Sequence, residues 1–263
     1  MMDLSRVRAA LWLAPAALTL AACNGTEPRA SHPLSLSVTT KGSSGVSLSA
    51  GSGMSAAIQV GSGANSLTIT KAQIVLARIE LSTAGACATT GEDDHCAELR
   101  LGPTLVDLPV DATTQVMLED VAVPAGTYSG VEAKLDAVKP DDDEPGVSAF
   151  LAAHPEFTGI SVKVTGVFTD ASNTNHDFTF TTEADARMEA TFNPPVTLAS
   201  DTKNFTFAVD IASWFTDASG AVIDPTNPAN AEAIERNIER SARVFEDDDH
   251  DGVDDHREGK HEH

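Results

Sequence analysis

A run of aspartates near the C-terminus is the part of the sequence best suited to chemistry. From Asp247 to Glu258 it fits the calcium-loop pattern D-x-D-x-D-G-x5-E, with acids at alternate positions before a glycine. Calcium is a hard cation that takes roughly six to eight oxygen ligands. The pattern therefore predicts a calcium site. Its expected ligands are Asp247, Asp249, Asp251, the main-chain carbonyl of Val253, Asp255 and Glu258.

Two features separate this run from the paired loops of a calcium sensor. Asp254 occupies the eighth position, where a hydrophobic residue would pair with a second loop, and only five residues follow Glu258. A shorter loop of the thrombospondin or dockerin kind, ending at Asp255, fits equally well. We expect a weak structural calcium site, in the extracellular range of roughly 10⁻⁴–10⁻³ M. The alternative is a solvated acidic tail.

Other polar segments offer possible cation ligands, but each has a simpler interpretation. A histidine-bearing tail could hold zinc, copper or nickel loosely, or could simply be solvated. Its histidines are His250, His256, His261 and His263. Two oxygen-rich segments, Asp141–Glu144 and Asp170–Asp177, could form a second cation site. Both are better explained as hairpin loops, where Asp and Asn serve turn geometry.

No arrangement of residues typical of an enzyme stands out. The sequence has no G-x-S-x-G elbow, H-E-x-x-H helix, glycine-rich phosphate loop or C-x-x-C redox pair. His154 and His176 lie among acids and serines, as they would in any chain of this composition. A carboxylate pair for glycoside hydrolysis stays open, because the separation between acids is not visible in a sequence. Trp214 with Phe215 is interpreted as core rather than as a ligand platform.

The N-terminal residues predict an exported lipoprotein. A positively charged start precedes the apolar stretch Ala9–Leu20, which is too short to span roughly 30 Å of hydrocarbon as a helix. The sequence Leu20-Ala21-Ala22-Cys23 is typical of a lipobox, so we expect residues 1–22 to be a signal peptide. Cys23 would carry diacylglyceryl and a third acyl chain, which together anchor stably. Ordinary secretion is the alternative. Asn24 favours the outer membrane of a Gram-negative bacterium, on its periplasmic or surface face.

The two remaining cysteines are expected to pair. Export places Cys87 and Cys96 in an oxidising compartment, where an even number of cysteines predicts a disulfide. The bond would close a short loop and stabilise the fold by about 2–3 kcal/mol. The alternative is a metal site formed with His95 and the acids of Glu92–Asp94, although this spacing matches no usual zinc pattern.

Charge and composition exclude some partners. The formal net charge of the 263-residue chain is −22, which argues against nucleic acid because its phosphates require Lys and Arg. The same charge opposes contact with an anionic membrane surface, so the expected membrane attachment is through the lipid anchor. Aromatic residues are 5 % of the chain, and platforms for stacking sugars or bases are therefore sparse.

Alternating apolar residues predict a β domain over residues 34–226, after a polar tether at residues 23–33. The expected strands are Leu67–Thr70, Ile74–Leu81, Glu98–Leu101, Thr104–Leu108, Gln115–Val121, Thr127–Val138, Ile160–Thr169, His176–Thr182, Met188–Phe192 and Phe205–Ile211. Short strands separated by turns are typical of a mainly β, antiparallel sandwich or barrel. One or two helical turns are expected at Val147–Ala153.

The hydrophobic period changes in the C-terminal segment, residues 227–263. Asn227-Pro228 places a capping residue before a proline, the usual start of a helix. Apolar residues then recur at intervals of three and four, at Ile234, Ile238, Ala242 and Phe245. This stripe predicts a helix over Pro228–Phe245 that runs directly into the aspartate loop, as the entering helix of an EF-hand does.

Several motifs in a fixed order resemble a group of uncharacterised bacterial lipoproteins built on a domain of unknown function. They are Ile74–Leu81, Val123–Tyr128 with the P-A-G-T-Y turn, Val209–Phe215, Gly220 with Asp224-Pro225, and Asn237–Ser241. The resemblance covers most of residues 60–255. It implies an immunoglobulin-like or transthyretin-like β-sandwich and supplies no activity.

These observations favour a non-enzymatic, lipid-anchored protein of the cell envelope that binds or adheres to an envelope protein or glycan, or serves a structural role. A hydrolase or carbohydrate-processing accessory on the same scaffold is one alternative. A metal-handling lipoprotein that uses the histidine and aspartate tail is the other.

Overall fold

The computed structural model describes residues 32–40, 57–84, 99–110, 116–123, 126–198, 203–249 and 251–255. The chain divides into two units, Met1–Ala30 and Ser31–His263, and every described residue belongs to the second unit. Within the described residues, no helix is both long and apolar enough to cross a membrane.

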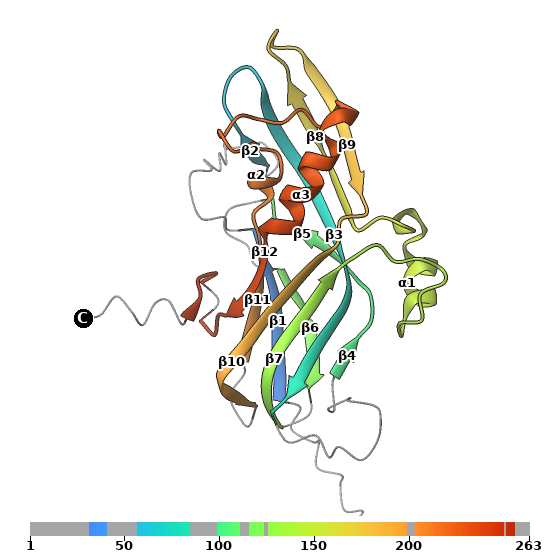
Figure 1. Cartoon of the computed structure of the whole chain (residues 1–263), viewed down its shortest axis with the longest axis vertical. Helices are drawn as coiled ribbons and strands as arrows, with labels where there is room; N and C mark the ends of the chain where they lie inside the picture. Colours follow the sequence, from blue (N-terminus) through green and yellow to red (C-terminus); the bar gives the residue numbers. More distant parts are fainter. Residues whose placement is uncertain are drawn as a thin grey trace, which may run out of the picture. The chain divides into compact units, whose positions relative to one another are not determined.

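Two β-sheets make up most of the described chain (Figure 1). The smaller sheet has the strand order β12-β11-β1-β6. Its strands are β1 (His32–Thr39), β6 (Val116–Val123), β11 (Lys203–Val209) and β12 (Ala242–Glu246). The strand β1 begins at His32, so the last two residues of the predicted tether belong to the sheet.

The larger sheet has eight strands, all paired antiparallel. Its main path is β10-β7-β3-β8-β9, and β2, β4 and β5 also pair with β3. The strands are β2 (Ile58–Val60), β3 (Ser66–Thr83), β4 (Leu99–Leu101), β5 (Thr104–Leu108), β7 (Gly126–Leu135), β8 (Val162–Thr169), β9 (Asn175–Thr182) and β10 (Ala186–Leu198). The prediction of a mainly β fold is confirmed.

One strand pair departs from the predicted antiparallel arrangement. The strands β1 and β11 run parallel, with Leu36 opposite Phe205 and Val38 opposite Phe207. A tight hairpin forces antiparallel pairing, but these two strands lie far apart in the sequence and no hairpin joins them. Their relative direction is therefore not fixed by a local turn.

The two sheets share one hydrophobic core. The ring of Phe192 on β10 stacks on that of Phe205 on β11, with 4.7 Å between their centroids. Leu36 and Phe207 of the smaller sheet join the same buried cluster. Each fully buried side chain of this size contributes about 1.5–3 kcal/mol, so the shared core is the main stabilising feature of the fold.

The central strand β3 is a single strand of 18 residues rather than the two that the sequence predicted. The predicted break, residues 71–73, begins just after Thr70, and Thr70 and Lys71 are both exposed. The pairing of β3 with β8 shifts register between Ile69 and Lys71, which marks a bulge. A bulge places two neighbouring residues on the solvent side, and this interrupted the alternation on which the prediction relied.

The short helix α1 (Val147–Ala153) forms where helical turns were predicted, and it covers the other face of β3. Val75 faces away from its buried neighbours on β3 and packs in a second cluster with Val147, Phe150 and Phe157. Alternation along a strand explains this, because successive side chains point to opposite faces.

The predicted helix Pro228–Phe245 is wrong in its second half. Asn227 caps a 3-10 turn, Pro228–Asn230, by accepting a hydrogen bond from the amide of Ala229 at 3.1 Å. The helix α3 (Ala231–Ser241) follows and buries Ile234 and Ile238, as the apolar stripe predicted. The next five residues form β12 instead, because they complete the edge of the smaller sheet by pairing with β11. A strand, not a helix, therefore leads into the aspartate loop.

We expect the variant Gly166→Ala to lower the free energy of unfolding by about 1–3 kcal/mol, as overpacking of a close-packed site does. A Cβ atom at Gly166 would lie 2.2 Å from the main-chain oxygen of Thr68 and 3.1 Å from the Cα of Ile69, and backbone cannot move aside easily. Urea unfolding followed by circular dichroism measures the loss. Gly126→Ala is the matched control, since its Cβ would make an ordinary 3.5 Å contact with the ring of Tyr128. Equal stability of the two variants would contradict this prediction.

Candidate metal centre

The aspartate loop begins where β12 ends. Asp247 follows Glu246 directly and is 0 % exposed, an unusual degree of burial for a carboxylate. Its Oδ2 accepts hydrogen bonds from the hydroxyl of Thr206 at 2.8 Å and from the amide of Gly252 at 3.1 Å. Its Oδ1 accepts one from the amide of Asp251 at 2.9 Å. These bonds fix the carboxylate in one orientation.

A buried polar layer supports Asp247 from the sheet side. The side chain of Asn204, on β11, donates to the main-chain oxygen of Asp247 at 2.8 Å and to the hydroxyl of Thr206 at 3.0 Å. Thr206 in turn lies 2.6 Å from the hydroxyl of Ser37 on β1. Two neighbouring strands, β11 directly and β1 through Thr206, therefore support the start of the loop.

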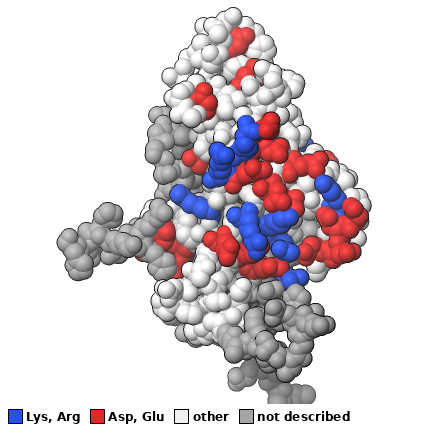
Figure 2. Space-filling view, in the orientation of Figure 1, with Lys and Arg blue, Asp and Glu red and all other residues white. Residues whose placement is uncertain are grey.

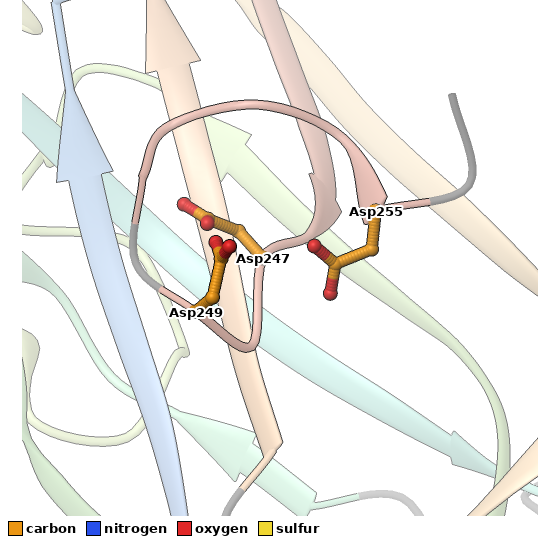
Figure 3. Close-up of side chains that lie close together, drawn as sticks. All are labelled: Asp247, Asp249 and Asp255. Atoms are coloured by element: carbon orange, nitrogen blue, oxygen red, sulfur yellow. The ribbon is translucent and has the colours of Figure 1, made fainter. Parts of the chain in front are cut away.

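Three carboxylates of the loop converge. Asp247, Asp249 and Asp255 each offer an oxygen, and these oxygens lie within 4.8 Å of one another. Figure 3 shows the carboxylates of Asp247 and Asp249 close together, with that of Asp255 directed toward them from the far end of the loop. Oxygens on opposite sides of a calcium ion are roughly 4.6–5.2 Å apart, twice the Ca–O distance. The cluster can therefore hold a metal ion.

The turn that brings these residues together is the one the sequence predicted. Gly252 adopts a φ of +81°, which an L side chain rarely takes. The amide of Asp251 also donates to Oδ1 of Asp249 at 3.2 Å, and Oδ1 of Asp251 accepts from the amide of Val253 at 2.7 Å. The loop thus turns back so that Asp255 returns to Asp247.

The electrostatics of the cluster are those of crowded negative charges. Burial raises the pKa of Asp255, and the nearby charges of Asp248, Asp249 and Asp247 raise it further. A hydrogen bond from the amide of Asp248 to Oδ2 of Asp255, at 2.9 Å, acts in the opposite direction. A bound cation would relieve this repulsion, because an adjacent positive charge favours the ionised carboxylate.

No protein family, curated protein or solved structure matches this chain. The resemblance to uncharacterised lipoproteins therefore stays a prediction.

The structure brings together three of the six predicted calcium ligands. The carboxylate of Asp251 is not in the converging group. The predicted role of the main-chain carbonyl of Val253 stays a prediction, because the converging group consists of side-chain carboxylates. Glu258 lies outside the described residues, as do Cys23, the pair Cys87 and Cys96, and the histidine-bearing tail with His250. The predictions of lipidation, a disulfide and loose transition-metal binding on these residues stay predictions.

The segment that begins at Asp170 forms the hairpin turn between β8 and β9, as its simpler interpretation predicted, although its last three residues belong to β9. The segment Asp141–Glu144 is a loop between β7 and α1, not the hairpin that was predicted. Oδ1 of Asp170 accepts hydrogen bonds from the amides of Ser172 at 2.7 Å and Thr174 at 2.9 Å, the usual geometry of an aspartate in a turn. Its Oδ2 lies 2.9 Å from Nε2 of His176, and this contact lowers the pKa of Asp170. Within the described ranges, the aspartate loop is the only place where three or more metal-ligating side chains converge.

A second polar feature was missed from the sequence. Ion pairs cross the outer face of the larger sheet, where Arg78 contacts Glu80 at 3.2 Å, Glu144 at 3.1 Å and Glu132 at 3.6 Å. Figure 2 shows acidic and basic side chains interspersed on one face of the molecule. A hollow of about 870 Å³ lies beside these ion pairs, between the sheet and the loop before α1. The sequence does contain a pattern that indicates a charged outer face, because the charged residues Arg78 and Glu80 alternate with apolar residues along β3.

Proposed function

We propose that this chain is a lipid-anchored, non-enzymatic protein of the cell envelope that binds or adheres to an envelope protein or glycan, or serves a structural role there. Its β domain would be an immunoglobulin-like or transthyretin-like sandwich. A weak structural calcium site would complete its C-terminal loop. The lipid anchor at Cys23 would hold it at the membrane, on the outer membrane of a Gram-negative bacterium.

The observation that supports the calcium component is the convergence of Asp247, Asp249 and Asp255. Hard cations prefer carboxylate oxygens, whereas zinc, copper and nickel sites usually include histidine or cysteine. Calcium fits better than magnesium, because magnesium demands near-ideal octahedral geometry at about 2.0–2.1 Å and keeps several waters. A loop with one buried and two more accessible carboxylates suits the more tolerant ion.

The mixed ion pairs around Arg78 favour a polar partner over an apolar one. Among the described residues, Val253 is the only large hydrophobic side chain that is exposed, at 40 %. An apolar docking surface needs a contiguous patch of several such side chains. The surface therefore favours a partner recognised through charge and hydrogen bonds, such as a glycan or the polar face of another protein.

Isothermal titration calorimetry of the protein with calcium tests this proposal. We expect saturable binding with a Kd of roughly 10⁻⁴–10⁻³ M and weaker binding of magnesium. The double variant Asp249→Asn/Asp255→Asn should lose the heat of binding. The matched control is Asp141→Asn/Asp143→Asn, which removes the same charge from an exposed loop and should bind as the wild type does.

Two results would contradict the proposal. Absence of calcium heat up to about 10 mM would remove the calcium site, since weak extracellular sites bind below this concentration. Tight binding of zinc or nickel in place of calcium would instead favour the metal-handling alternative.

A further inference from the structure

Asn204 connects β11 to the aspartate loop through three hydrogen bonds. Its main-chain amide donates to Oδ1 of Asp248 at 3.1 Å, and its main-chain oxygen accepts from the amide of Asp247 at 3.0 Å. Its side-chain Nδ2 donates to the main-chain oxygen of Asp247 at 2.8 Å. One residue of the sheet therefore holds the first two residues of the loop.

Those two residues in turn place the converging carboxylates. Asp247 supplies one of the three, and the amide of Asp248 donates to Oδ2 of Asp255, which supplies another. Two of the three carboxylates thus depend, directly or through one intervening residue, on contacts with Asn204.

Asn204 is 1 % exposed, and its Oδ1 has no hydrogen-bond partner among the described residues. Its two Nδ2 hydrogens are shared among Asp247, Thr206 at 3.0 Å and Ser37 at 3.1 Å. A buried acceptor without a partner destabilises a fold. An apolar residue would avoid that cost, so the amide at this position is better explained by its contact with the loop than by stability alone.

The same residue lies at the end of the edge strand. β12 is the outer strand of the smaller sheet, and its last pair with β11 is Glu246 opposite Phe205, next to Asn204. If β12 left β11, Asp247 would lose both Asn204 and the hydroxyl of Thr206. Its carboxylate would then no longer be held beside that of Asp255.

We infer that Asn204 is a positioning residue that couples cation binding in the aspartate loop to the pairing of β12 with β11. Cation binding and docking of the edge strand then form one equilibrium. This inference rests on the proposed calcium site and names its role, which is to lock the last strand of the sheet. Coupling of this kind is reciprocal. Calcium therefore favours the docking of β12 by the same factor by which the docking of β12 strengthens calcium binding.

Hydrogen exchange of the wild-type protein, with calcium or with a chelator, tests the coupling. If opening of β12 releases the ion, exchange of the amides in residues 203–209 and 242–249 slows by a factor of 1 + [Ca²⁺]/Kd. This is roughly 10- to 100-fold at about 10 mM calcium. The amides of β8 and β9 serve as an internal reference and should change little.

Asn204→Ala tests the residue itself, with Ser37→Ala as the matched control. Ser37 belongs to the same buried network, through Thr206 and Asn204, but makes no hydrogen bond to the described residues of the loop. We expect Asn204→Ala to weaken calcium binding by roughly 5- to 10-fold, the effect of one hydrogen bond, and to reduce the calcium-dependent protection of β11 and β12. Ser37→Ala should lower stability with and without calcium alike and leave the calcium affinity unchanged.

The outcomes separate the inference from the proposed function. Calcium binding without slower exchange in β11 and β12 would overturn the coupling and leave the calcium site intact. Wild-type affinity in Asn204→Ala would overturn the role of Asn204. No calcium heat in the wild type would overturn the site and the coupling together. If Asn204→Ala does not fold, the wild-type exchange experiment still decides whether the coupling exists.

Discussion

Replacing Trp214 by alanine is expected to lower the free energy of unfolding by about 3–5 kcal/mol, the usual range for a fully buried tryptophan. Trp214 is 0 % exposed and ends the short helix α2 (Ile211–Trp214). Its indole Nε1 donates to the hydroxyl of Ser241, the last residue of α3, at 2.6 Å. The substitution therefore opens a cavity and breaks one of the hydrogen bonds that join the two helices.

Further contacts explain why this site cannot collapse easily. Phe215, also 0 % exposed, sets its ring edge-on against Phe178 at 6.0 Å and Phe180 at 6.1 Å, both on β9. The side chain of Asn237 on α3 donates to the main-chain oxygens of Trp214 at 3.1 Å and Thr216 at 2.9 Å. These contacts hold the backbone around the cavity in place, so little relaxation can offset the loss.

Urea unfolding measures the effect, with circular dichroism as the signal because the substitution removes a fluorophore. Trp214→Phe keeps most of the volume and should cost about 1–2 kcal/mol, and Ser241→Ala removes only the hydrogen bond and should cost about 1 kcal/mol. A loss below about 1 kcal/mol in Trp214→Ala would contradict the assignment of this residue to the core. The burial of Trp214 and Phe215 confirms their interpretation as core from the sequence.

Local alternation explains why most of the larger sheet could be predicted. The strand Thr104–Leu108 and the helix Val147–Ala153 form at the predicted residues, because each places its apolar side chains with the period of a strand or a helix. Alternation says nothing about partners that lie far away in the sequence. The parallel pairing of β1 with β11 was therefore out of reach.

The error at the C-terminus has a similar cause. Ala242 and Phe245 continue the helical stripe of α3, and nothing in the local pattern favours a strand. The open edge of β11 is a tertiary feature, and the hydrogen bonds that it offers to residues 242–246 outweigh continued helix. Val244 and Phe245 are both buried although they are neighbours, which neither simple period predicts.

The candidate site was predicted in composition more than in geometry. Oxygen-rich spacing and Gly252 were visible in the sequence, and Asp249 and Asp255 do converge with Asp247. The supporting residues Asn204 and Thr206 carry no motif. They become part of the site only because β11 runs beside the loop.

Asp247→Asn is expected to weaken calcium binding by about 100-fold or more, the largest effect of any single substitution in the loop. The removed charge is buried, where electrostatic interactions are least screened by water. The asparagine amide would also present hydrogens toward the hydroxyl of Thr206 or the amides of Asp251 and Gly252, which are donors themselves. Both the charge and the loop geometry would be lost.

Calorimetric titration with calcium ranks the carboxylates by their contribution to binding. It compares Asp247→Asn, Asp249→Asn and Asp251→Asn with the control Asp143→Asn. Asp249 lies on the exposed side of the loop, so Asp249→Asn should weaken binding by only about tenfold, because water screens its charge. Asp143→Asn, in an exposed loop elsewhere, removes the same single charge and should bind calcium as the wild type does. If Asp247→Asn and Asp143→Asn weakened calcium binding equally, only the net charge of the protein would be attracting the ion.

The variant Asp251→Asn distinguishes the calcium ligands that the sequence pattern predicts from those that the folded loop brings together. The pattern treats Asp247, Asp249 and Asp251 as equivalent ligands, whereas the structure gathers the first two with Asp255 and directs Oδ1 of Asp251 to the amide of Val253. We therefore expect Asp251→Asn to weaken calcium binding less than Asp247→Asn does. Equal losses in these two variants would show that the ion draws Asp251 into its coordination shell, and the calcium-bound loop would then follow the spacing of the sequence.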